Sequence, residues 1–203
     1  VDIPSTVTHI DSSAFSGARS LKRVDLSDGL VQIGDNAFYG CTRLTRIVIQ
    51  DSVTSIGNYA FFDCTGLTSI DIRGGVGTIG DSAFADCTSL TSITLPRTVY
   101  QIGSRAFAHC HSLSSLWVDT NNPTYHSAGN CIIHTSSKTL VLGCKNSRIP
   151  TDGSVTSIGP WAFYGSPDLT GISIPNGITS IGEGAFSDCS GLTGITIPDS
   201  VTS

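Results

Sequence analysis

The residues of this sequence that could take part in the widest range of chemistry are its seven cysteines, because thiols can form disulfides, bind metals or act as nucleophiles. Five of them occupy one column of a 23-residue pattern: Cys41, Cys64, Cys87, Cys110 and Cys189. The same column holds Ala18 and Ser166. A position that accepts alanine, serine or cysteine selects for a small buried side chain. We therefore expect free, packed thiols in this column rather than disulfides.

Cys131 and Cys144 lie outside that column, and they could form a disulfide. They belong to two apolar, β-branched runs, 131–135 and 139–144, which predict a β-hairpin. Such a hairpin would place the two cysteines opposite each other, about 4.5–5.5 Å apart, within reach of a disulfide. The alternative is that both are small residues that pack the hairpin onto its neighbours. The sequence leaves both possibilities open.

His109, Cys110 and His111 are a candidate metal site, but their spacing argues against one. Zinc requires three or four ligands that converge at about 2.0–2.3 Å. Consecutive residues around a buried cysteine point their side chains in different directions. We therefore expect no metal and no cofactor.

Catalytic motifs are absent from the sequence. It contains no nucleophile elbow, phosphate-binding loop, H-E-x-x-H motif or dinucleotide-binding fingerprint. An active site also needs one place unlike the others, whereas most of this chain repeats itself. We therefore expect a protein that is not an enzyme.

An internal repeat of 23 residues positions all of these side chains, and a repeat of this length indicates a solenoid. The consensus is V-T-x-I-G-x-x-A-F-x-x-C-x-x-L-T-x-I-x-I-P. Its aromatic column consists of Phe15, Phe38, Phe61, Phe84, Phe107, Phe163 and Phe186. Each unit alone would expose its apolar face, so stability requires stacked neighbours.

The segment L-T-x-I-x-I alternates apolar and polar positions, which is typical of a strand with one buried face. Identical strands one repeat apart must run parallel. We expect one parallel sheet from residues 46–50, 69–73, 92–96, 115–118, 171–175 and 194–198. The segment I-G-x-x-A-F-x-x-C must form the crossover between strands. Helix-capping residue types follow its glycine, namely Asp35, Asn58, Asp81 and Ser104, and predict short helical or 3-10 turns opposite the sheet.

The repeat resembles the BspA-like class of leucine-rich repeats, found on surface proteins of gut and oral anaerobes and of some parasitic protists. The resemblance rests on the I-G-x-x-A-F-x-x-C signature and covers nearly the whole chain. It implies an α/β leucine-rich-repeat solenoid, a right-handed superhelix with a parallel β-sheet on its concave face. It also implies an extracellular location, at the cell surface or secreted. The asparagine that usually follows the strand is absent, so we expect no asparagine ladder at that corner.

The repeat is interrupted once, at residues 119–150, where Phe107 and Phe163 stand two repeats plus ten residues apart. We expect this segment to be one enlarged repeat that carries the β-hairpin, and the resembled family has a similar insert that protrudes from the solenoid. Because strands continue on both sides, we expect residues 1–203 to form a single domain. Both ends fall inside a repeat, so we expect the chain to be an excerpt of a longer protein.

Composition and charge exclude several classes of partner. Charged residues make up only 13% of the chain, the net charge is −5, and no run of lysine or arginine occurs. These features argue against nucleic acids and anionic membranes as partners. No stretch approaches the roughly 18 consecutive apolar residues of a membrane span.

The residues best suited to contact a ligand lie on the solvent-facing side of the predicted sheet. This column contains Val48, Asp71, Thr94 and Trp117. Trp117 stands out, because aromatic anchors contribute most of the energy at interfaces. Tyr125 and His126 follow a few residues later and complete the candidate ligand site. The alternative is that Trp117 packs beneath the hairpin.

The sequence therefore favours an extracellular recognition or adhesion module that binds protein or glycan through the concave sheet and the insert. The alternative is a passive spacer or stalk within a larger surface protein. The small polar residues of the sheet favour the spacer, whereas Trp117 and the insert favour recognition. An enzyme has the least support.

Overall fold

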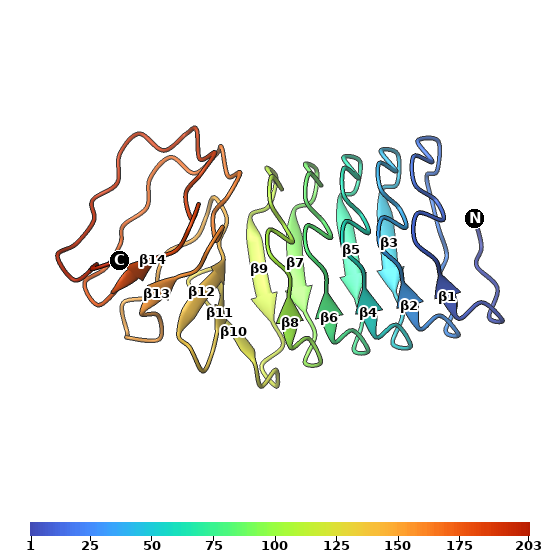
Figure 1. The fold of residues 1–203 in the computed structure, drawn as a ribbon, viewed down its shortest axis with the longest axis horizontal. Coiled ribbons are helices and arrows are strands. Elements are labelled where there is room, and N and C mark those ends of the chain that lie inside the picture. The colour runs from blue at the N-terminus through green and yellow to red at the C-terminus, as the bar shows by residue number, and fades with distance from the viewer.

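The computed structural model describes all residues, 1–203, as a β-solenoid of about eight turns (Figure 1). Successive turns lie side by side along the long axis, and the two termini lie at opposite ends. This arrangement follows from the repeat, since each turn covers the apolar face of the turn before it. The chain has no helix long and apolar enough to cross a membrane.

A parallel sheet that the sequence analysis did not anticipate runs along the first five turns. It is built from two-residue strands at the isoleucine of the I-G pair: β1 (His9–Ile10), β2 (Gln32–Ile33), β4 (Ser55–Ile56), β6 (Thr78–Ile79) and β8 (Gln101–Ile102). Ile10 pairs with Ile33, and Ile33 pairs with Ile56. Because the register advances by one repeat at each step, constant repeat length is what makes this sheet possible.

The prediction of one continuous concave sheet from the L-T-x-I-x-I segments is wrong, because fewer of these segments form strands and the strands do not join in one sheet. The structure has two separate parallel pairs, β3 (Arg46–Ile49) with β5 (Ser69–Ile72), and β7 (Ser92–Leu95) with β9 (Ser115–Val118). Residues 171–175 and 194–198 form no strand.

Proline and glycine explain the missing strands. Pro96 follows β7 and has no N–H to continue the bonding toward β5, and Pro175 and Pro198 end the two later segments in the same way. Those segments also begin with Gly171 and Gly194, which lack the side chain that stiffens a strand.

The crossover segments contain hydrogen-bonded turns, and the predicted helical turns are absent. In the second turn, alternate N–H groups of Asn36, Phe38 and Gly40 donate to carbonyl oxygens of Asn58, Ala60 and Phe62 in the next turn, at 2.7–2.8 Å. Asn36 and Gly40 adopt left-handed backbone angles, with φ of 55° and 66°. A helix needs consecutive right-handed residues, so this alternation prevents one.

The polar residues expected to cap helices instead bridge one turn to the next. Asp35 Oδ1 accepts a hydrogen bond from the N–H of Asn58 at 2.7 Å, and Asn58 Oδ1 accepts one from Asp81 at 2.8 Å. Asp81 Oδ1 accepts from Ser104 at 2.7 Å. The side chains thus satisfy backbone donors, as caps do, but the donor belongs to the following turn.

The phenylalanine column forms a continuous stack inside the first five turns. From Phe15 to Phe107 the ring centroids are 5.1–5.3 Å apart and neighbouring rings are within 8° of parallel. Phe163 and Phe186 form a second stack, with centroids 5.2 Å apart. The buried side chains correspondingly form two clusters, of 37 and 13 residues.

The insert contributes β10 (Tyr125–Ala128), β11 (Cys131–His134) and β12 (Thr139–Leu142). The expected hairpin is present, since β11 pairs antiparallel with both β10 and β12. β12 then pairs parallel with β13 (Ser157–Ile158), which pairs with β14 (Ser180–Ile181). Leu140 lies opposite Ile158 and takes the place of the isoleucine column. The insert is therefore a layer of the solenoid, and the expected protrusion is wrong.

Replacing Phe61 with alanine should lower the free energy of unfolding by roughly 3–5 kcal/mol, because truncating a core aromatic leaves a cavity. Phe61 is 0% exposed and stacks on both Phe38 and Phe84. Urea denaturation measures the loss. Alanine at the exposed Arg43 should change stability by less than about 0.5 kcal/mol. Equal stability of the two variants would contradict the proposed role of the stack.

Replacing Asp81 with alanine should cost about 1 kcal/mol, because the N–H of Ser104 loses its acceptor. Asp81→Asn keeps a side-chain oxygen in place and should retain most of the stability. Thermal melts of the two variants and the wild type make the comparison. A loss as large for asparagine as for alanine would show that charge, and not the hydrogen bond, matters at this position.

Candidate functional site

Trp117 is the most exposed aromatic residue on the face formed by β3, β5, β7 and β9, which the sequence predicts to be the concave face. Its side chain lies on β9, the last strand of the regular turns, and 62% of it is exposed. The indole Nε1 donates a hydrogen bond to Ser115 Oγ at 2.9 Å. Trp117 therefore does not pack beneath the hairpin, and its ring is oriented by a neighbour on its own strand.

The other candidate residues of this face lie in register with one another along the sheet. Thr94 pairs with Trp117, and Val48 pairs with Asp71. Asp71 and Thr94 are exposed, and Val48 is half-buried. Asp71 Oδ2 is 3.8 Å from Arg73 Nε, so its charge is partly balanced at the surface. The face thus offers one large ring beside small polar groups.

The insert covers the free edge of β9 with side chains. Asn130 Oδ1 accepts a hydrogen bond from the N–H of Leu116 at 2.8 Å, and Ser127 Oγ accepts one from Val118 at 3.2 Å. Asn130 Nδ2 also donates to the carbonyl of Ser114 at 2.9 Å. An open strand edge invites pairing with other chains. Here the edge is satisfied, so the neighbourhood of Trp117 is fixed in place.

The structure does not bring Tyr125 into the same surface as Trp117, which corrects the sequence-based cluster. Tyr125 is only 6% exposed and belongs to the core, where its ring meets His134 edge-on at 5.4 Å. Burial raises the pKa of its phenol. His126 is half-buried, and its Nδ1 lies 3.0 Å from Thr135 Oγ1. Strand alternation explains the split, because adjacent residues face opposite sides.

The column cysteines are free thiols that act as hydrogen-bond donors. Cys64 Sγ donates to the carbonyl oxygen of Phe38 at 3.2 Å, and Cys87 Sγ donates to that of Phe61 at 3.2 Å. The same bond recurs for Cys41, Cys110 and Cys189. Burial raises the pKa of every one of these thiols, to about 12 for Cys110. A protonated thiol is an inert nucleophile, so the column is structural.

Cys131 and Cys144 are also free thiols in the structure. A bulge shifts the hairpin register between Ile132 and Ile133. In addition, Cys131 belongs to the smaller core cluster and Cys144 to the larger one. Burial raises the pKa of both thiols, to about 11 for Cys131. Cys144 is near enough to contribute to the raised pKa of Cys131, so a disulfide between them stays a prediction that a thiol count tests.

The histidines around Cys110 point to different neighbours. His109 meets His111 and Tyr164 edge-on at 6.0 Å and 4.7 Å, and its Nε2 is 3.9 Å from Asp188 Oδ2. No three His, Cys, Asp or Glu side chains converge anywhere in the chain as a metal site requires.

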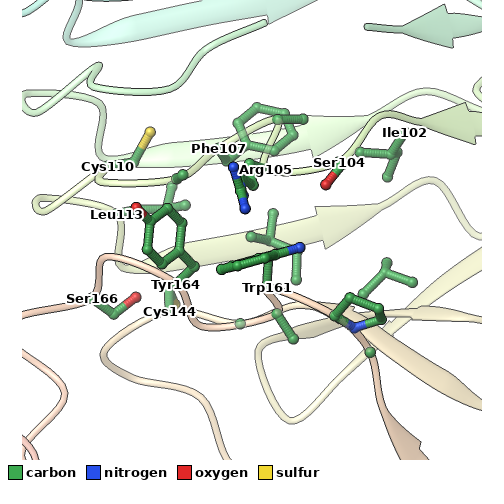
Figure 2. Close-up of a pocket in the computed structure, with 18 of the residues that line it drawn as sticks. Ile102, Ser104, Arg105, Phe107, Cys110, Leu113, Cys144, Trp161, Tyr164 and Ser166 are labelled. Atoms are coloured by element: carbon green, nitrogen blue, oxygen red, sulfur yellow. The ribbon is translucent and has the colours of Figure 1, made fainter. Parts of the chain in front are cut away.

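A cavity of about 240 Å³ lies where the insert meets the regular turns (Figure 2). One wall includes Arg105 and Phe107, and the opposite wall includes Gly143, Trp161 and Tyr164. None of these residues is a candidate site residue on the sequence alone. The interrupted phenylalanine spacing is the one sequence feature that indicates the location of the cavity, because it shows where one repeat differs from the rest.

The stacked parallel strands and the phenylalanine column define a leucine-rich-repeat solenoid. The family model "BspA type Leucine rich repeat region (6 copies)" matches residues 1–115 and 133–203. The chain therefore belongs to the BspA-type leucine-rich-repeat family. No curated protein sequence matches it.

Three solved structures share the fold. The pneumococcal vaccine antigen PcpA has a TM-score of 0.84 at 24% identity, over 98% of this chain and 51% of that one. A T. pallidum leucine-rich-repeat protein gives 0.65 at 28%, over 98% and 78% of the two chains. One from Bacteroides ovatus ATCC 8483 gives 0.59 at 28%, over 98% and 61%. This chain thus spans about half of the pneumococcal protein.

A thiol-reactive dye should label the folded protein slowly at pH 8, because burial raises each thiol pKa and leaves little thiolate. Unfolding in denaturant without reductant should then expose all seven cysteines. Raising the pH toward 11 should accelerate labelling of the native state as thiolate forms. A count of five on the unfolded protein would reveal one disulfide and contradict the free-thiol assignment.

Proposed function

We propose that this chain is a surface recognition module that binds a protein or a glycan through its concave face, with Trp117 as the anchor. The observation that carries the proposal is the exposure of the Trp117 ring, 62%, at the end of an otherwise small and polar face. A rigid ring with a polar edge supplies contact area at little entropic cost, which is why tryptophan dominates binding interfaces.

The surroundings of Trp117 support a ligand with hydroxyl or amide groups. Ser92, Thr94 and Ser115 lie on the two strands beside the ring and provide donors and acceptors. Val48 and Asp71 extend the same face toward the N-terminal turns. His126 lies on β10 of the insert, which contacts β9 at the C-terminal end of this face. Most of the apolar area for a ligand is therefore concentrated at Trp117.

Family membership and the relatives support a location outside the cell. The chain belongs to the BspA-type repeat family, and the pneumococcal structure is described as a vaccine antigen. The low charge content and the Ser/Thr-rich turns agree with an extracellular surface. No nucleic acid or membrane insertion is part of the proposal, since the net charge is −5.

The second candidate is a spacer that holds other domains away from the cell. The near-identical small residues of the concave face, Ser69, Ser92 and Ser115, favour it, because they offer few distinctive contacts. The two functions differ in one testable property. A recognition module binds something that depends on Trp117, whereas a spacer binds nothing through this face.

Trp117→Ala should weaken binding by at least about tenfold, or about 1.4 kcal/mol, while the melting temperature stays within a degree or two of the wild-type value. Glycan and matrix-protein panels provide the ligand, and titration of the best hit provides the affinities. Tyr100→Ala is the matched control, because Tyr100 is 61% exposed and lies outside the concave strands. Equal weakening by both variants would contradict Trp117 as the anchor, and no hit at all would favour the spacer.

A further inference from the structure

One row of backbone amides links each turn of the solenoid to the next. In the fourth turn, the N–H groups of Ser82, Phe84 and Asp86 donate to carbonyls of Ser104, Ala106 and Ala108 at 2.8–3.0 Å. The first three turns repeat this pattern, and so does the turn of Phe163, which donates to Ala185 at 2.8 Å. The row is thus a regular feature wherever another ordinary turn follows.

The row is unsatisfied in the fifth turn, at the cavity. The N–H groups of Arg105, Phe107 and His109 donate no hydrogen bond, although the residues occupy the same three positions. Phe107 is only 4% exposed, whereas Arg105 is exposed. A ligand that accepts hydrogen bonds from these donors would restore the pairing that the other turns have.

The phenylalanine stack is also interrupted at this point. The N–H of Gly143 donates a hydrogen bond to the carbonyl oxygen of Ala162 at 2.8 Å. In a regular turn the phenylalanine of the column makes this bond, as Phe84 does to Ala106, so Gly143 occupies the phenylalanine position. A Cβ at Gly143 would lie 2.0 Å from the ring of Phe163, so this position has no side chain to offer. One ring is therefore missing between Phe107 and Phe163. The Phe163 ring lies against Gly143, and the cavity lies on the Phe107 side of this gap.

Burial of equivalent residues shows that this gap opens the core. Phe84 and Cys87 in the fourth turn are 0% exposed. Phe107 and Cys110, one turn later, are 4% and 8% exposed. Both turns have phenylalanine and cysteine at these two positions, so the greater exposure in the fifth turn comes from the missing ring in the next turn. The apolar part of the cavity wall includes Ala106, Phe107 and Leu113 of the fifth turn.

The charge at the mouth of the cavity is positive. The Arg105 guanidinium lies over the Trp161 ring, 3.7 Å from its centre, and forms no ion pair (Figure 2). Asp168, the acid that lines the cavity, is already 3.4 Å from Lys145. The unpaired cation and the free amides of Arg105 and Phe107, which line the cavity, favour an acceptor that carries negative charge.

We infer that the cavity binds a small aromatic carboxylate. Its ring would take the place of the missing phenylalanine against Phe107. Its carboxylate would accept hydrogen bonds from the free amides of the fifth turn and pair with Arg105. A neutral ring would leave the donors unpaired, and an aliphatic acid would leave the stack open, so the walls select for both groups together.

Titration with 3-phenylpropionate tests the inference directly. Trp161 and Trp117 are the only tryptophans, so a Trp117→Phe protein reports on the cavity through Trp161 fluorescence. We expect saturable binding, with 3-phenylpropanamide and hexanoate at least about tenfold weaker. Equal binding of the amide would overturn the carboxylate assignment, and equal binding of hexanoate would overturn the ring assignment. Absence of binding by all three at millimolar concentration would overturn the site.

Two variants test whether the acid binds in the cavity. Each introduces a residue type that another turn has at the same position of the repeat. Arg105→Asn places at a left-handed position the residue found at Asn36, and it should weaken binding at least about tenfold. Ala108→Tyr copies Tyr39 in the same column and should obstruct the cavity. Arg43→Asn, away from the cavity, should bind as the wild type does. Wild-type affinity in both cavity variants would show that the acid binds elsewhere.

Hydrogen exchange provides a readout that does not depend on mutation. The Phe107 amide should exchange faster than the Phe84 amide in the free protein, because only Phe84 has an acceptor. Adding 3-phenylpropionate should slow exchange at Phe107 and leave Phe84 unchanged. An unchanged Phe107 rate at saturation would contradict the proposed contact between the carboxylate and the free amides.

Discussion

Hydrogen bonds between consecutive turns organise this solenoid. In the crossover segments of the first four turns, alternate backbone N–H groups point along the long axis and bond to the next turn, as Phe38 does to Ala60 at 2.7 Å. The segment must then alternate between right-handed and left-handed residues, which excludes a helix. The phenylalanine stack and the thiol bond from each cysteine to a phenylalanine carbonyl follow from the same spacing.

Because each turn supplies the hydrogen-bond acceptors of the turn before it, a turn of different structure can leave backbone N–H groups unpaired. The insert supplies acceptors on one face of the solenoid and not on the other. Along β9, Asn130 and Ser127 supply side-chain acceptors for the strand edge. Along the crossover face, Gly143 replaces an aromatic residue, and three amides of the fifth turn have no acceptor. The same insert therefore closes the concave side and opens a cavity on the other side.

This contrast bears on function in a repeat family. Identical turns present identical side chains, so most of the concave face is uniformly small and polar. Trp117 and the cavity, with Arg105 and Trp161 at its mouth, both lie where the repeat changes. The family relatives share the solenoid itself. In the proposed recognition function, specificity is therefore expected to depend on the residues around the interruption of the repeat.

The family, the solenoid, the buried phenylalanine column and the hairpin could all be predicted from the sequence, because each follows from a spacing that any stacked arrangement must respect. It also indicated free thiols, since Ala18 and Ser166 share the cysteine column. Four other features depend on how the turns stack. Asp35 and Asn58 bridge turns instead of capping helices, because the available amide lies 23 residues away. Tyr125 turns into the core, because adjacent residues of a strand face opposite sides. Cys131 and Cys144 enter different core clusters. The cavity exists because the insert lacks one ring, and a missing neighbour becomes visible only when the turns are stacked.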